Sequence, residues 1–339
     1  MIRMPFDPDA PAHPDSGIFG LPTQKKDAKI VLIPVPFDAT TSYGSGTSVG
    51  PSIIFRASAQ VDLFDTRLGR IYEQGIHMLD EAEAIMEWSD EAGKLAASIG
   101  GEDQNAESDA QALADVEAIG EKVNRYVHAE ARKLHAAGKV PGVVGGDHSV
   151  PLGAIRAAAE AHGEFGILHI DAHLDMRVAY EGFRYSHASI MFNVLSTIPQ
   201  TAKIVSVGVR DVGEKEIEYA RSLGGRASIF FDAAMQERLL EGARWSAIVA
   251  EIIAELPDKV YISFDIDGLD PSLCPHTGTA VPGGLSFAQA ALLLEAVKKS
   301  GKKVIGFDLV EVSPNLYPES SEWDANVGAR ILYKLCGTV

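Results

Sequence analysis

The stretch FGILHIDAHLD, residues 165–175, changes abruptly from apolar to polar. Residues 165–170 form a nearly continuous hydrophobic run, which is typical of a strand buried on both faces of a parallel sheet. Asp171, His173 and Asp175 then alternate with other residues, so an extended chain would direct all three side chains to one face. The stretch therefore predicts a buried strand with charged and imidazole side chains at its carboxyl end.

Six other apolar runs resemble this strand, and segments of helical period separate them. The runs cover residues 29–37, 140–145, 203–209, 228–231, 260–264 and 303–309. The helical segments include residues 120–135, 151–162, 245–256 and 286–299. Alternation of this kind indicates an α/β fold, a three-layer αβα sandwich with a mostly parallel central sheet. In such a sheet the functional loops lie at the carboxyl ends of the strands.

Polar clusters follow three more of these runs: GGDHS at 145–149, DIDGLDP at 265–271 and DLVEV at 308–312. Carboxylates gathered at one edge of a sheet would repel one another unless a positive charge lay among them. The converging set has four carboxylates and two imidazoles: His148, Asp171, His173, Asp175, Asp265 and Asp267. A mixed nitrogen and oxygen set without thiolates suits two Mn²⁺ or similar divalent ions and argues against a cysteine-rich zinc site.

The composition limits the class of protein. The chain has 339 residues, of which 46% are hydrophobic and 23% charged, as in soluble globular proteins. Its net charge of −17 disfavours partners such as nucleic acids and anionic membranes. The only cysteines, Cys274 and Cys336, suit a reducing compartment, and no signal peptide or long apolar segment is evident, so a cytoplasmic protein is expected.

Two regions stand apart from the strand and helix pattern. Residues 80–117 contain twelve Asp or Glu residues and one Lys, which indicates an acidic, solvated insertion of loop with short helices. Residues 1–28 contain five prolines and are expected to form an extended arm that packs on the domain or on a neighbouring subunit. Residues 29–339 would then form a single domain.

The motifs GGDHS, DAHLD and SFDIDGLDP, in this order, resemble those of the ureohydrolase family of arginases, agmatinases and related amidinohydrolases. Residues 34–51 and 276–284 resemble further loops of that family, so the similarity covers residues 29–337 apart from the acidic insertion. The resemblance implies an arginase-like fold and a homo-oligomer, a trimer or a hexamer.

The resemblance also implies a role for each matching residue. His148, Asp171, Asp175 and Asp265 would hold one ion, and Asp171, His173, Asp265 and Asp267 the other, with Mn²⁺ expected and Ni²⁺ an alternative. A hydroxide between the ions would attack a guanidino carbon, which releases urea or a substituted urea and an amine or ammonia. Glu311 would pair with the guanidinium, His187 would carry a proton to the leaving amine, and Asp175 or Asp267 would relay a proton.

The substrate is less defined than the reaction. Ala188 stands after His187 where relatives usually have Gly, and Met176-Arg177 follow DAHLD where arginases carry an Asn nearby, so arginase itself is not expected. The stretches YSHASIMFN, CPHTGT and EWDANVGAR resemble an agmatinase-like branch that includes guanidine hydrolases. Agmatine-like compounds and small guanidines are therefore expected, with guanidino acids and substituted guanidines or biguanides as alternatives.

Several residues would shape the pocket. Arg177 or Arg184 at its mouth would disfavour the free amine of agmatine and favour a carboxylate. Tyr43, Phe183 and Trp323 would narrow it. Three other classes stay open: a deacetylase-like hydrolase with one zinc, an auxiliary subunit that pairs with an active homologue, and a metal-binding module without activity.

Overall fold

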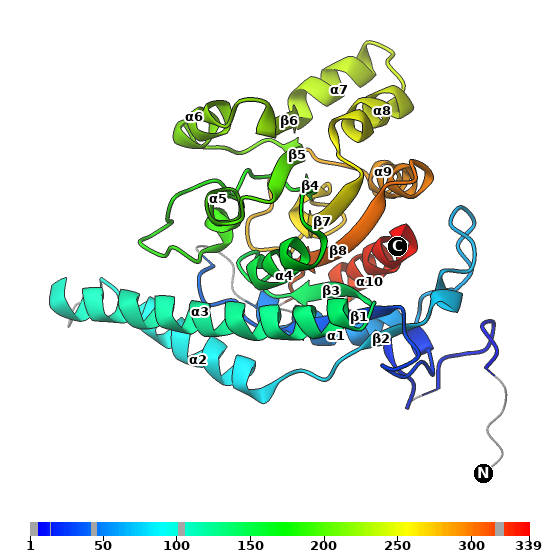
Figure 1. Cartoon of the computed structure of the whole chain (residues 1–339), viewed down its shortest axis with the longest axis horizontal. Coiled ribbons are helices and arrows are strands. Elements are labelled where there is room, and N and C mark those ends of the chain that lie inside the picture. Colours follow the sequence, from blue (N-terminus) through cyan, green and yellow to red (C-terminus); the bar gives the residue numbers. More distant parts are fainter. Residues whose placement is uncertain (1–5, 14, 42–45, 101–105, 316–321) are drawn as a thin grey trace.

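The computed structural model describes residues 6–13, 15–41, 46–100, 106–315 and 322–339, so Tyr43 lies outside the described part. There the chain forms one eight-stranded sheet in the order β2-β1-β3-β8-β7-β4-β5-β6, and all neighbouring strands are parallel (Figure 1). The strands are β1 (Ile30–Val35), β2 (Ile76–Met78), β3 (Val140–Gly145), β4 (Phe165–Ile170), β5 (Thr201–Val209), β6 (Ala227–Phe231), β7 (Lys259–Asp265) and β8 (Lys303–Val310).

Helices cover both faces of the sheet, which confirms the predicted sandwich. One face packs against α1 (Gly50–Ser58), α7 (Asp232–Leu240), α8 (Trp245–Glu255), α9 (Phe287–Lys299) and α10 (Trp323–Thr338). The other packs against α2 (Glu83–Ser98), α3 (Ala106–Ala136), α4 (Leu152–His162), α5 (Ile190–Thr197) and α6 (Glu214–Ser222). Successive strand residues serve opposite faces: Leu32 joins the first core, whereas Val31 and Ile33 join the second.

All seven apolar runs identified in the sequence form strands. The eighth strand, β2, was missed because it has only three residues and pairs with β1 at the edge of the sheet. So short a run shows no clear period.

The acidic region differs from the expected loop with short helices. It forms α2 and the first part of the 31-residue α3. Each helix buries an apolar stripe, with Ile85 and Ala92 of α2 and Val116 of α3 in the core beside β1. Most acidic side chains lie on the solvent-facing sides of these helices, and their number obscures the helical period of the apolar residues in the sequence. Figure 1 shows the two helices side by side along one side of the molecule.

The proline-rich segment before β1 packs on the domain. Ile18, Phe19 and Leu21 are buried, and the Phe19 backbone N–H donates to Ser58 Oγ of α1 at 2.8 Å. No helix within the described ranges combines the length and the apolarity needed to cross a bilayer.

The middle of the sheet leaves no space for a side chain at Gly142 of β3. This residue lies in register between Leu32 of β1 and Phe307 of β8, and a Cβ atom there would come within 2.5 Å of the Phe307 ring and 2.7 Å of Leu32 Cδ2. We expect Gly142→Ala to lower the free energy of unfolding by about 1–3 kcal/mol, because the core must shift to admit the methyl group.

A urea titration followed by circular dichroism would measure this change. The matched control is Gly93→Ala in α2, where a Cβ meets nothing within 4 Å. Ala is favoured over Gly in helices by up to about 1 kcal/mol, so the control should equal or exceed the wild type. Equal stabilities of Gly142→Ala and the wild type would contradict this account of the packing.

Candidate active site

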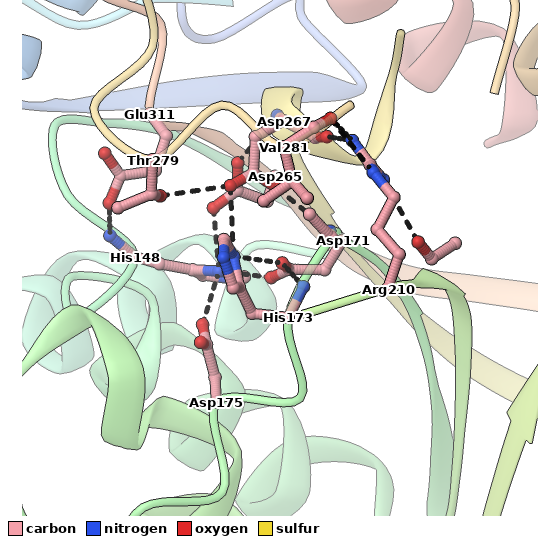
Figure 2. Close-up of polar contacts among 12 residues, drawn as sticks. His148, Asp171, His173, Asp175, Arg210, Asp265, Asp267, Thr279, Val281 and Glu311 are labelled. Carbon is pink, nitrogen blue, oxygen red and sulfur yellow. Dashed lines mark hydrogen bonds and ion pairs between the residues drawn. The ribbon is translucent and has the colours of Figure 1, made fainter. Parts of the chain in front are cut away.

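The candidate site lies at the carboxyl ends of β3, β8, β7 and β4, four neighbouring strands in the middle of the sheet. Parallel strands end at the same edge, so the polar segments after them meet there. The structure brings together all six side chains that the sequence predicted as metal ligands, and Figure 2 shows them pointing toward one another, with Glu311 beside them.

One group of atoms surrounds His148 Nδ1. Carboxylate oxygens of Asp171, Asp175 and Asp265 lie 3.1, 3.1 and 3.2 Å from this nitrogen. All four residues are buried, yet Nδ1 makes no hydrogen bond. Donor atoms that converge without hydrogen-bond geometry fit a common cation better than they fit one another.

A second group surrounds His173 Nδ1, which lies 3.4 Å from Asp171 Oδ1 and 3.1 Å from Asp267 Oδ2. Asp171 thus contributes Oδ2 to the first group and Oδ1 to the second. Asp265, the other residue expected to bridge, has Oδ2 in the first group, while its Oδ1 accepts from the Asp267 backbone N–H at 2.9 Å. The donor set therefore fits two adjacent cations that share Asp171.

The electrostatics of the protein alone show how strongly this cluster needs positive charge. Burial and the neighbouring Asp267 and Asp171 raise the pKa of Asp265 well above its usual range. Burial would lower the pKa of His173, but the Asp267 and Asp171 carboxylates raise it to about 12. Without a cation, protonation of Asp265 and His173 is therefore favoured, and divalent ions would displace these protons.

Outer hydrogen bonds orient His148. Ser263 Oγ donates its hydrogen to Asp308 Oδ1 at 3.0 Å. Ser263 Oγ can therefore only accept from His148, whose Nε2–H lies 2.9 Å away. Nε2 therefore carries a proton, and Nδ1 is the ring nitrogen that faces the carboxylates and can bind a cation. Burial raises the pKa of Asp308 to about 6.

His169 belongs to the site although sequence reasoning passed over it. Its Nε2 lies 2.8 Å from Asp171 Oδ2 and its Nδ1 lies 3.1 Å from Ser206 Oγ. Both of these partner residues are fully buried. The available signal was a lone imidazole inside an otherwise apolar strand, where a buried polar group requires partners.

Glu311 follows β8 in a left-handed backbone conformation, with φ of +63°. Its Oε1 accepts from the His148 backbone N–H at 2.8 Å, and its own N–H donates to Gly146 O at 2.8 Å. Burial and the nearby Asp147 raise the pKa of its carboxyl well above the usual range. Asp175 is also left-handed, with φ of +52°. Such conformations in non-glycine residues persist where surrounding contacts enforce them, often at functional sites.

His187 begins the short helix η4 (His187–Ser189). Its Nδ1 lies 2.9 Å from Thr40 O, so Nδ1 carries the proton and Nε2 is free to accept one. Burial lowers the pKa of this imidazole, and the Asp175 carboxylate partly opposes that effect.

The two arginines expected at the mouth have different surroundings. The Arg177 guanidinium stacks on the Tyr180 ring at 4.9 Å, and that ring lies 5.7 Å from the His187 ring, so Arg177 is on the His187 side. Arg184 stacks on Tyr185, whose hydroxyl donates to Glu121 of α3.

The structure describes two of the three aromatic residues that were expected to narrow the pocket, Phe183 and Trp323. Phe183 is buried in the core with α2 and α3, so its assignment to the pocket wall was wrong. Trp323 is 45% exposed at the start of α10, where its indole N–H donates to Ser272 O.

Comparisons with known proteins identify the family of this chain. The sequence model of the arginase family matches residues 28–337. The N(1)-aminopropylagmatine ureohydrolase of Thermus thermophilus is 36% identical over 291 residues, which cover 86% of this chain and 84% of that protein. The guanidinobutyrase of Pseudomonas aeruginosa is 27% identical over 313 residues, which cover 90% and 84%.

A solved structure is similar over nearly its whole length. Proclavaminate amidinohydrolase from Streptomyces clavuligerus superposes with a TM-score of 0.73 at 25% identity, covering 97% of this chain and 98% of that one. Since the family model spans almost the whole chain and a relative above 30% identity covers most of it, the protein belongs to the arginase family.

Proposed function

We propose that this protein hydrolyses the guanidino group of a small molecule and releases urea, or a substituted urea, and an amine or ammonia. The observation that carries the proposal is the pair of donor groups around His148 and His173, which share Asp171 and lie beside the buried Glu311. We assign His148, Asp171, Asp175 and Asp265 to one divalent ion, and Asp171, His173, Asp265 and Asp267 to the other. The chemistry that such ions supply is activation of a water molecule and stabilisation of negative charge.

Glu311 would bind the substrate. A guanidinium presents parallel N–H donors to a carboxylate, and such charge-assisted pairs are strong when buried. The His148 N–H already holds Oε1 of Glu311, which fixes the carboxylate relative to the ligands of the first ion. The arriving cation would counter the burial that raises the pKa of this group, so Glu311 would be ionised in the complex.

His187 would move the proton that the leaving amine needs. Because Nδ1–H is held by Thr40 O, the exchangeable position is Nε2. A neutral ring can take a proton at Nε2 and pass it to the departing nitrogen. Asp175 would serve as the intermediate acceptor, because burial and the neighbouring Asp171 raise its pKa. Asp267 is the alternative relay.

The substrate we propose is agmatine-like or a small guanidine, and the runner-up is a guanidino acid. Named relatives include both an aminopropylagmatine ureohydrolase and a guanidinobutyrase, so family membership supports either type. Arg177 on the His187 side favours an anionic tail, although its Nε lies 3.5 Å from the buried carboxylate of Glu216, which offsets part of its charge.

Finer assignments follow the chemistry of the donor set and the family. Nitrogen and oxygen donors without thiolates suit Mn²⁺, with Ni²⁺ as the alternative. Two overlapping donor groups argue against a one-zinc deacetylase-like site, and a complete ligand set argues against an inactive auxiliary subunit or a metal-binding module. We further propose a cytoplasmic homo-oligomer, a trimer or a hexamer.

A urea-release screen tests the function. The purified chain, loaded with Mn²⁺ or with Ni²⁺, would be incubated with agmatine, 4-guanidinobutyrate, 3-guanidinopropionate, arginine, guanidine, and dimethylated or biguanide analogues. We expect urea or a substituted urea from at least one of them and little from arginine. Absence of product from every compound with two ions bound per chain would refute the proposed reaction.

Asp171→Ala tests the shared ligand. We expect loss of both ions and a fall in urea release of more than about 100-fold, the upper range for residues that only orient ligands. Metal content after dialysis, measured by mass spectrometry, checks the first effect. The control is Asp258→Asn, an exposed carboxylate at the opposite edge of the sheet, which should retain both ions. A variant of Asp171 that keeps two ions would contradict the assignment.

Arg177→Met tests the choice between amine and acid tails. Loss of a charged hydrogen-bond donor should shift the ratio of kcat/KM from 4-guanidinobutyrate toward agmatine by about 10-fold, chiefly through KM. Arg184→Met is the matched control, since Arg184 stacks on Tyr185 beside α3, and it should leave the ratio unchanged. If both variants keep the wild-type ratio, Arg177 does not contact the substrate tail.

A further inference from the structure

Two sequence motifs without an assigned role, CPHTGT and EWDANVGAR, meet in the structure. His276 of the first pairs with Asp324 of the second, 48 residues later. The His276 backbone N–H donates to Asp324 Oδ1 at 3.0 Å, and its ring Nδ1–H donates to Asp324 Oδ2 at 2.8 Å. Asp324 is only 2% exposed, and both of its carboxylate oxygens thus bind His276.

The loop that contains His276 depends on such contacts for its shape. It leaves and rejoins the domain at a bridge between Leu269 and Leu285, and the residues between them form turns without a helix or strand. Backbone hydrogen bonds therefore fix the base of the loop, from Asp270 N–H to Leu285 O and from Leu285 N–H to Gly268 O. Side chains from elsewhere must fix the rest of it.

Two anchors from separate elements hold the far part of this loop. One is the Asp324 carboxylate in the first turn of α10, next to Trp323, whose indole N–H donates to Ser272 O at 3.1 Å. The other is Arg210, which follows β5 and donates to Val281 O, as well as to the backbone carbonyls of Asp267 and Leu269. Figure 2 shows Arg210 directed toward Val281 and Asp267 beside the ligand cluster.

Thr279 lies between the two anchors, three residues after His276 and two before Val281. Its hydroxyl donates to Asp267 Oδ2 at 3.2 Å. That oxygen is the one that lies 3.1 Å from His173 Nδ1, at the centre of the second donor group. The loop therefore delivers a hydrogen bond to a carboxylate oxygen that we assign to the second ion.

We infer that Asp324, acting through His276 and Thr279, is a positioning residue for the Asp267 carboxylate and hence for one of the two ions. The inference rests on the proposed ligand roles of Asp267 and His173. We call the two hydrogen bonds between Asp324 and His276 the clamp. If the clamp loosens, the part of the loop that contains Thr279 is held only by Arg210 at Val281, and Asp267 loses a partner that fixes its metal-facing oxygen. The residues of the first donor group all lie outside this loop, so the ion assigned to that group should respond less than the other.

Metal titration without substrate tests the inference. Asp324→Asn keeps an oxygen for the His276 backbone N–H but cannot also accept from its ring Nδ1–H. We therefore expect an about 10-fold higher dissociation constant for one Mn²⁺ and little change for the other. Thr279→Ala should weaken the same ion, whereas Thr279→Ser, which keeps the hydroxyl, should restore binding. The double variant Asp324→Asn/Thr279→Ala should bind no more weakly than Thr279→Ala, because both changes break one path.

The matched control is Asp270→Asn in the same loop, where the carboxylate accepts hydrogen bonds from the backbone N–H and the hydroxyl of Ser272. It should bind both ions normally. If Asp324→Asn does not fold, His276→Ala removes the ring contact alone and should give a smaller loss at the same ion. Wild-type affinity for both ions in the clamp variants, or additive losses in the double variant, would overturn the inference. Because no substrate is present, this outcome is independent of the urea-release screen.

Discussion

Mutual repulsion of buried carboxylates is the constraint on which the rest of this structure depends. Asp171, Asp175, Asp265 and Asp267 are gathered at one edge of a sheet that excludes water from them. In the protein alone, burial and the neighbouring carboxylates raise the pKa of Asp265, and the Asp267 and Asp171 carboxylates raise that of His173 to about 12. Two divalent cations would balance the same charge and leave the donor atoms where they are.

Holding charges together in this way requires rigid support from outside the cluster. Ser263 and Asp308 orient His148, and His169 holds Asp171 at Oδ2, the oxygen that belongs to the first donor group. Arg210 binds the carbonyl of Asp267 while Thr279 binds its carboxylate. The left-handed conformations of Asp175 and Glu311 show that the backbone, too, is shaped to the site.

The sequence predicted the parts that repeat a simple period. Seven of the eight strands were evident because each is a continuous apolar run, and the six donor residues were evident because they follow such runs directly. Helix α2 and the first part of α3 were not, because charge on their outer faces obscured the stripe that contains Ile85 and Val116. Phe183 was assigned to the pocket wall, but an aromatic side chain near a site packs into a core as readily as into a cavity.

By itself, therefore, the sequence determined the fold class, the edge of the sheet that carries chemistry and the residue types gathered there. These features depend on local pattern and on the shared direction of parallel strands. Only the tertiary structure decided that Asp171 has an oxygen in both donor groups, that Arg177 stacks on the Tyr180 ring next to His187 whereas Arg184 stacks on Tyr185, and that Asp324 holds His276. Such contacts join residues far apart in the chain or fix side-chain directions, and both depend on how the whole domain packs.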